Sequence, residues 1–99
     1  AGVEGCIVSG PLALDGAISM ESVKHKGISN PVAGQADILL VPFIEVGNVL
    51  YKACTYIAGK TMASTICGAT CPVIITSRAD TPDSKYYSIL MAVLRCMKG

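Results

Sequence analysis

Short apolar runs of strand length, each separated from the next by turn or helix signals, constrain the fold of this chain most strongly. The clearest run is ADILLVP at residues 36–42, and another, PVIITS, occupies residues 72–77. Near-continuous apolar runs of this length are typical of strands buried on both faces of a parallel sheet. We expect two further strands, one near residues 5–8 and one within TMASTICGA at residues 61–69.

Segments with helical spacing of apolar residues lie between these runs. The spacing predicts helices over residues 14–26, over 46–58, and from 81 or 82 to about 97. Gly27 and Gly59 follow the first two, where glycine suits the left-handed end of a helix. The order strand-helix-strand-helix-strand-strand-helix predicts an α/β fold with a mostly parallel sheet and flanking helices.

The composition indicates that much of the surface is an interface. The 99 residues suit one domain, and 52% of them are hydrophobic while only 15% are charged. About 25% charged residues is usual for a globular chain. We therefore expect this chain to pack against further protein in a larger assembly.

Two classes of partner are excluded by the same numbers. No apolar run approaches the roughly 18–20 residues that a membrane-spanning helix needs. The net charge is +1, with eight Lys and Arg against seven Asp and Glu and no basic run. The sequence therefore predicts neither a membrane nor a nucleic-acid partner.

The cysteines do not form a metal-binding pattern. There are five, an odd number, and only Cys67 and Cys71 are close in sequence, while the single histidine, His25, lies far from them. A zinc site would need two further ligands at matching spacing. We expect reduced, buried thiols, no metal, and a cytoplasmic protein.

The polar loop Ser77–Ser84, between the run at 72–77 and the last helix, is the first candidate site. Helix N-termini present free N–H groups to anions, and the arginine fork matches phosphate oxygens. On one reading, Ser77, Arg78 and the helix N-terminus bind an anion such as phosphate. On the other, the segment is a solvated turn in which Asp80 or Thr81 caps the helix and Arg78 pairs with Asp80.

The stretch VPFIEVGNVLYK, residues 41–52, is a second candidate. Here Gly47 would permit a close approach of the backbone to a ligand, and Asn48 could cap the helix or donate to that ligand. The alternative is an ordinary loop and helix start with Lys52 in solvent. The chain has no Walker loop, no GxGxxG and no HExxH, and its one histidine supports no Ser-His-Asp set.

Several ordered motifs resemble the C-terminal part of the phosphate acetyl/butyryltransferase family. They are GPLALDGAIS, KHKGI, ADILLVPFIEVGNVLYK and the run from PVIITSRADT to SKYYSI, and the resemblance covers essentially all 99 residues. The TSRAD and SKYYSI stretches are most similar to the butyryl branch. The resemblance implies that residues 1–99 are a single partial domain of a two-domain α/β enzyme whose N-terminal region is absent.

The resemblance also implies a reaction. Enzymes of this family transfer a short-chain acyl group between coenzyme A and inorganic phosphate, as substrates, with no metal or tightly bound cofactor. They are commonly homo-oligomers, and we expect this chain alone to be inactive because further phosphate-binding arginines lie in the N-terminal part. The alternative function is a non-catalytic module that binds coenzyme A or phosphate, or that serves oligomerisation.

Site residues follow from the matched motifs. Ser77 would donate a hydrogen bond near the thiol sulfur or the developing oxyanion, and Arg78 would bind phosphate or stabilise transition-state charge. Gly47 and Asn48 would join Ser77 and Arg78 in binding the substrates.

Two positions depart from the acetyl branch of the family. The aspartate proposed there as the base is replaced by Ser84, so that Asp80 and Asp83 are the nearby candidates for a base. An anion-binding arginine of that branch is replaced by Thr55.

Overall fold

The computed structural model of the chain describes residues 3–97, whose contacts fall into two compact units, Ala1–Val41 and Pro42–Gly99. We call them the N-terminal and the C-terminal unit and describe each by itself.

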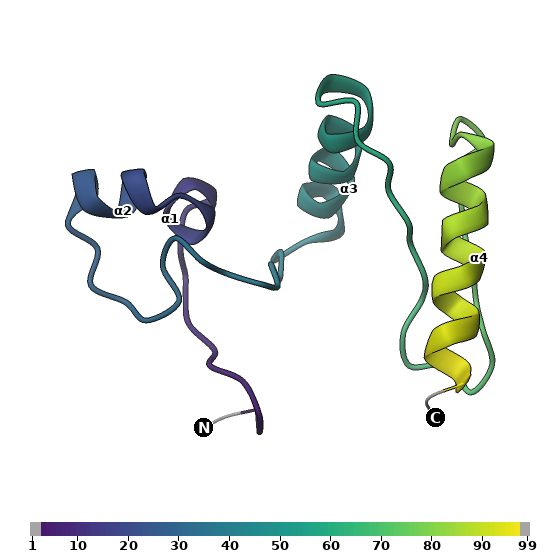
Figure 1. The fold of residues 1–99 in the computed structure, drawn as a ribbon, viewed down its shortest axis with the longest axis horizontal. Helices are drawn as coiled ribbons and strands as arrows, with labels where there is room; N and C mark the ends of the chain where they lie inside the picture. Colours follow the sequence, from purple (N-terminus) through teal and green to yellow (C-terminus); the bar gives the residue numbers. More distant parts are fainter. Residues whose placement is uncertain (1–2, 98–99) are drawn as a thin grey trace. The chain divides into compact units, whose positions relative to one another are not determined.

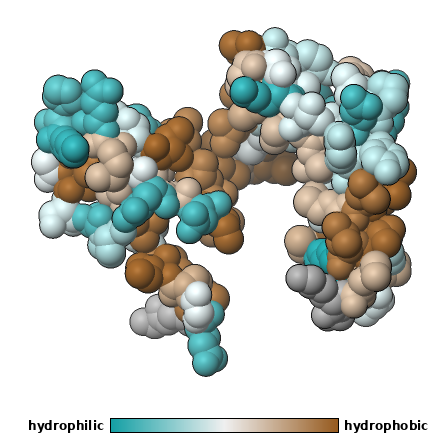
Figure 2. Space-filling model, viewed as in Figure 1, coloured by the Kyte–Doolittle hydropathy of each residue, from teal (hydrophilic) through white to brown (hydrophobic). Residues whose placement is uncertain are grey.

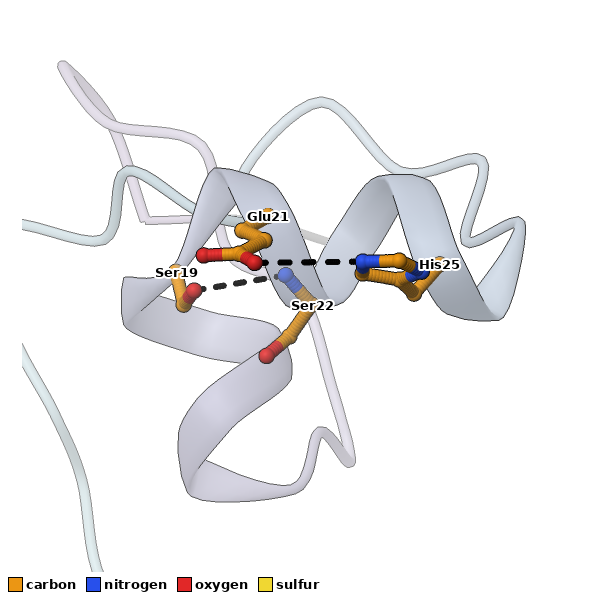
Figure 3. Close-up of polar contacts among 4 residues, drawn as sticks. All are labelled: Ser19, Glu21, Ser22 and His25. Carbon is orange, nitrogen blue, oxygen red and sulfur yellow. Dashed lines mark hydrogen bonds and ion pairs between the residues drawn. The ribbon is translucent and has the colours of Figure 1, made fainter.

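The N-terminal unit contains two short helices, α1 (Leu14–Ile18) and α2 (Met20–Lys26) (Figure 1). Ser19 separates them because its extended backbone interrupts the helix, and its side chain accepts a hydrogen bond from the Ser22 backbone N–H, which caps α2 (Figure 3). Gly27, at φ 64°, ends α2 in the left-handed conformation as predicted. The single helix predicted over 14–26 is therefore two helices.

Side chains and a returning loop hold this unit together. Lys26 Nζ lies 2.6 Å from Asp15 Oδ2, while His25 and Glu21 face each other along exposed α2 (Figure 3). The loop after α2 returns to α1 through two backbone hydrogen bonds, from Gly34 N to Gly16 O and from Ala36 N to Ala17 O, of 2.9 and 3.0 Å. The side chains buried by this arrangement are small and apolar: Ala17, Val23 and Ala33.

The C-terminal unit contains α3 (Ile44–Lys52), a π-helical turn η1 (Ala53–Ile57) that continues it, and the long helix α4 (Pro82–Met97). The helices predicted over 46–58 and from 81 or 82 to 97 are confirmed. Gly59 follows η1 at φ 66°. Thr81 is the cap of α4, since its Oγ1 accepts the Ser84 backbone N–H at 3.2 Å.

A narrow stripe of small residues on α4 is buried in this unit. Ser84, Ser88 and Ala92 follow one another at intervals of four residues and are buried. Ser88 Oγ donates to Ser84 O at 2.8 Å and accepts the Ser64 backbone N–H at 2.9 Å. The extended chain between η1 and α4 therefore runs beside α4 (Figure 1).

The predicted mostly parallel sheet is wrong for residues 3–97. The segments at 5–8, 36–42, 61–69 and 72–77 are not strands, and their one pairing is an isolated antiparallel bridge between Ile66 and Val73. A strand exists only where a second strand hydrogen-bonds to it along its length. Beyond that bridge, the four segments form no ladder of backbone hydrogen bonds among residues 3–97, so apolar composition alone did not make a sheet.

The apolar segments leave large side chains at the surface instead. Within the run at 36–42, Ile38 is 86% exposed and Leu40 is 97% exposed. Exposed residues of α4 include Val93, Leu94 and Met97, and Figure 2 shows hydrophobic residues widely spread over the visible face. Large amounts of exposed apolar surface are characteristic of proteins that pack against a partner.

The cysteine prediction was correct in one respect and wrong in another. All five thiols are free. They are not buried, because Cys6, Cys67, Cys71 and Cys96 are exposed and Cys54 is half-buried. Within residues 3–97, no three His, Cys, Asp or Glu side chains are grouped to hold a metal ion, and no helix there is long and apolar enough to cross a membrane.

Candidate functional site

The polar loop Ser77–Ser84 is held against the end of α3 and η1 by three side chains. Tyr51 OH donates to Asp80 Oδ2, Lys52 Nζ donates to Ser77 Oγ, and Tyr56 OH donates to Ala79 O, each at 3.2 Å. The partners are separated by 23–29 residues in sequence. One helix end therefore fixes three residues of the loop.

A π-helical turn continues α3 at the end that contacts the loop, and it contains Tyr56. In η1 the Ala58 N–H bonds to Ala53 O at 2.9 Å, the five-residue spacing of a π-helix. Such turns are rare and often occur at functional sites. Thr55, where the resemblance places an arginine in other members, donates its hydroxyl to Tyr51 O at 3.0 Å and so completes the helix locally.

Asp80 is buried in the polar loop and holds it by accepting hydrogen bonds. It is only 8% exposed, and its Oδ2 accepts the Ser77 backbone N–H at 2.9 Å in addition to the Tyr51 hydroxyl. Burial, and then the hydrogen bond to Asp80, raises the pKa of Tyr51 above its ordinary value of 10.0, so the phenol remains a donor at neutral pH. Asp80 Oδ1 is buried and finds no hydrogen-bond partner among residues 3–97.

Ser77 and Arg78 lie at the exposed side of this loop. Ser77 is half-buried and Arg78 is exposed, and within the described chain no carboxylate lies at ion-pair distance from the Arg78 guanidinium. The reading in which Arg78 pairs with Asp80 is therefore not what the structure shows. Asp83, in the first turn of α4, is also exposed.

Gly47 and Asn48 lie inside α3 and not before it, because α3 begins at Ile44. The interpretation of Asn48 as a helix cap is wrong for this reason. Asn48 does line an open hollow of about 540 Å³ on the surface of α3 and η1, together with Lys52 and Tyr56. Lys52, which lines this hollow, also donates to Ser77 Oγ, so one residue from each predicted site lies beside the same lysine.

Sequence reasoning missed Tyr51, Lys52 and Tyr56 as contributors to the site. The Tyr-Lys pair was part of a recognised motif, but Lys52 was considered only as a solvated residue. It is half-buried, and its Nζ lies 5.9 Å from the centre of the Tyr51 ring and 5.6 Å from that of Tyr56. No short-range pattern in the sequence reports these contacts, because their partners lie 23–29 residues away.

The loop and the end of α3 bring together an arginine with no ion-pair partner among residues 3–97, a lysine and the half-buried hydroxyl of Ser77. Comparison with known proteins places the chain in a family. The family model for phosphate acetyl/butaryl transferase matches residues 3–93. The chain therefore belongs to the phosphate acetyl/butaryl transferase family, as the sequence motifs predicted.

The chain aligns with only part of the length of individual relatives. The chain is 52% identical over 92 residues to phosphate acetyltransferase of Thermotoga maritima, and 54% identical over 91 residues to the probable phosphate butyryltransferase of Bacillus subtilis. These alignments cover 93% and 92% of this chain but 31% and 30% of the relatives. The chain thus spans about a third of the length of these relatives.

A solved structure shows the same similarity in three dimensions. The crystal structure of a branched-chain phosphotransacylase from Enterococcus faecalis V583 superimposes with a TM-score of 0.79 at 47% sequence identity, covering 88% of this chain and 32% of that one. The local fold described above is thus shared with a protein named as a phosphotransacylase.

Proposed function

We propose that this chain forms one wall of the active site of a phosphate acyltransferase. The reaction transfers a short-chain, butyryl-like acyl group between coenzyme A and inorganic phosphate. The observation that carries the proposal is the Ser77-Arg78 pair, held at the surface by Tyr51, Lys52 and Asp80, in a chain of this family.

In the direction of acyl phosphate formation, a phosphate oxygen attacks the thioester carbonyl carbon. The new carbon–oxygen bond forms while negative charge collects on the carbonyl oxygen, and the carbon–sulfur bond then breaks. Coenzyme A leaves as the thiolate, and the proton lost by phosphate ends on its sulfur. Every atom comes from the two substrates, so the protein has to bind, orient and stabilise charge.

Each residue of the site has a part in this scheme. The Arg78 fork binds phosphate, since no protein carboxylate among residues 3–97 occupies it, and Ser77 donates to the oxyanion or the sulfur. Asn48 lines the hollow where substrate would lie, and Gly47 precedes it in α3. Of the two candidate bases, Asp83 is exposed, whereas Asp80 is buried and already accepts two hydrogen bonds.

The proposal extends to the setting in which the chain works. The widely exposed apolar side chains support packing against further protein, in the same enzyme and in a homo-oligomer. The five free thiols support a reducing compartment, the cytoplasm. No metal or tightly bound cofactor enters the scheme.

Thiol release by the complete gene product tests the proposal. With phosphate present, we expect it to cleave butyryl-CoA, with acetyl-CoA and branched acyl-CoA as comparison substrates, and we expect residues 1–99 alone to be inactive. Arg78→Ala should lower kcat/KM by about 100-fold or more, as removal of a transition-state charge contact does. Binding of coenzyme A without any phosphate-dependent release would instead identify a binding module.

A further inference from the structure

The Ser77 hydroxyl is in an unusual hydrogen-bonding state. Its Oγ accepts from Lys52 Nζ and from the Ala79 backbone N–H, both at 3.2 Å. A serine hydroxyl has two lone pairs and one hydrogen, so both acceptor positions are used. Within the described part of the chain, no group accepts the Ser77 hydrogen, which leaves it available to a ligand.

Lys52 is held in place for this contact. Its ammonium lies near the faces of Tyr51 and Tyr56, at 5.9 and 5.6 Å from the ring centres, where the negative ring faces attract a cation. Both tyrosines are themselves fixed by hydrogen bonds to the polar loop. A freely solvated lysine would have none of these constraints.

The charge of Lys52 is not neutralised by the described residues. Ion pairs there join Lys26 to Asp15 and His25 to Glu21, and none involves Lys52. An ammonium that donates to a hydroxyl oxygen withdraws electrons from it and strengthens the O–H as a donor, because bonds with a charged partner are the stronger ones. It also leaves a positive charge directly behind the place where an anion would accept from Ser77.

We propose that Lys52 is a positioning residue that commits the Ser77 hydroxyl to donate its hydrogen to the oxygen or sulfur that becomes negative during acyl transfer. The inference rests on the proposed function and extends it to a residue of α3. With both lone pairs engaged, Ser77 Oγ stabilises charge and does not attack the acyl group. The Ala79 N–H fixes the second lone pair, so the hydrogen can point only away from both donors.

A double-mutant cycle in the complete gene product tests the inference. Lys52→Met and Ser77→Ala are each expected to lower kcat about 100-fold, the effect of losing one oxyanion donor, with KM for butyryl-CoA changed less than about threefold. If Lys52 acts through Ser77, the double variant should be no slower than Ser77→Ala by more than about threefold. Lys60→Met, which removes the same charge from an exposed lysine eight residues further along the chain, should retain the wild-type rate.

Two outcomes would overturn the inference while the wild-type enzyme is active. One is a wild-type rate for Lys52→Met, and the other is a double variant whose loss is the product of the single losses, about 10,000-fold, because Lys52 would then act independently of Ser77. If Lys52→Met fails to fold, the same comparison is made with Lys52→Arg, in the wild-type and in the Ser77→Ala background. Lys52→Arg should slow the enzyme with Ser77 present and have no effect in the Ser77→Ala background, and an equal effect in both backgrounds would contradict the proposal.

Failure of the underlying function gives a different result. A complete, folded wild-type protein that releases no thiol from any acyl-CoA in the presence of phosphate would refute the proposed function before any variant is compared. The inference about Lys52 would fall with it.

Discussion

The side chains buried in the N-terminal unit are small and apolar, whereas in the C-terminal unit Asp80, Ser84 and Ser88 are buried beside Ala92. Polar contacts in the first unit are local or exposed, such as those of Ser19 and His25. In the second they join residues 23–29 positions apart around one loop. Burying a polar group costs free energy unless it forms hydrogen bonds. We therefore expect the buried polar side chains of the C-terminal unit to have a role in structure or in function.

Among the substitutions that test this difference between the two units, Gly34→Ala in the N-terminal unit should lower the unfolding free energy most. Gly34 has φ +80°, and a Cβ there would collide with Met20 Sδ and approach the Met20 backbone. Strained backbone and overpacking together should cost about 3 kcal/mol of unfolding free energy. Gly27→Ala is the matched control, with φ +64° but open space around the new Cβ. Equal losses in the two variants, measured by urea unfolding, would show that packing around Gly34 is unimportant.

Ser88→Ala should have the next largest effect, in the C-terminal unit. It removes the bond to Ser84 O and leaves the Ser64 N–H without its acceptor. An unsatisfied donor in a packed region costs about 2 kcal/mol. Lys85→Ala on the exposed face of α4 should cost far less. Faster amide exchange at Ser64 in the Ser88 variant would locate the loss, and unchanged exchange would argue against this contact.

Tyr51→Phe should cost about 1 kcal/mol at pH 7, since it removes one hydrogen bond to a carboxylate. The effect should depend on pH in a defined direction. The folded pKa of Tyr51 is raised above 10.0, so its stabilisation is present below pH 10 and is lost as the pH rises through the folded value. Urea unfolding of wild type and variant should therefore converge in strong alkali. A constant difference across that range would refute the role of the phenol proton.

Asp15→Asn should have the smallest effect, because the pair is half-exposed to solvent. The hydrogen bond from Lys26 lowers the pKa of Asp15 below 3.8, so the pair stabilises the N-terminal unit above that pH and its contribution is lost as the pH falls through the folded value. We expect a small drop in melting temperature at pH 7 that disappears at pH 2 and in 1 M salt. A drop that persists in high salt would indicate a packing effect.

Local signals in the sequence predicted the helices well. Thr81-Pro82-Asp83 gave the start of α4, and Gly27 gave the end of α2, because caps depend on residues within a few positions of each other. Strands could not be predicted in the same way. An apolar run such as 36–42 indicates a tendency to avoid water, but pairing depends on a second segment that the run does not specify.

The candidate site was predicted in part for the same reason. Ser77 and Arg78 were recognisable from a motif and from their place before a helix. Lys52 and Tyr51 were not, since their contacts with Ser77 and Asp80 span 25 and 29 residues. The raised pKa of Tyr51 likewise depends on burial that no local pattern reveals.

The central claim is that the half-buried Ser77 hydroxyl of the polar loop serves chemistry and the buried Ser88 hydroxyl of α4 serves packing. Initial rates of phosphate-dependent thiol release from butyryl-CoA, measured per folded molecule for Ser77→Ala and Ser88→Ala in the complete gene product, test it directly. We predict a loss of kcat/KM of about 100- to 1000-fold for Ser77→Ala and a rate within about threefold of wild type for Ser88→Ala. Wild-type activity in the Ser77 variant, or equal losses in the two, would contradict the account.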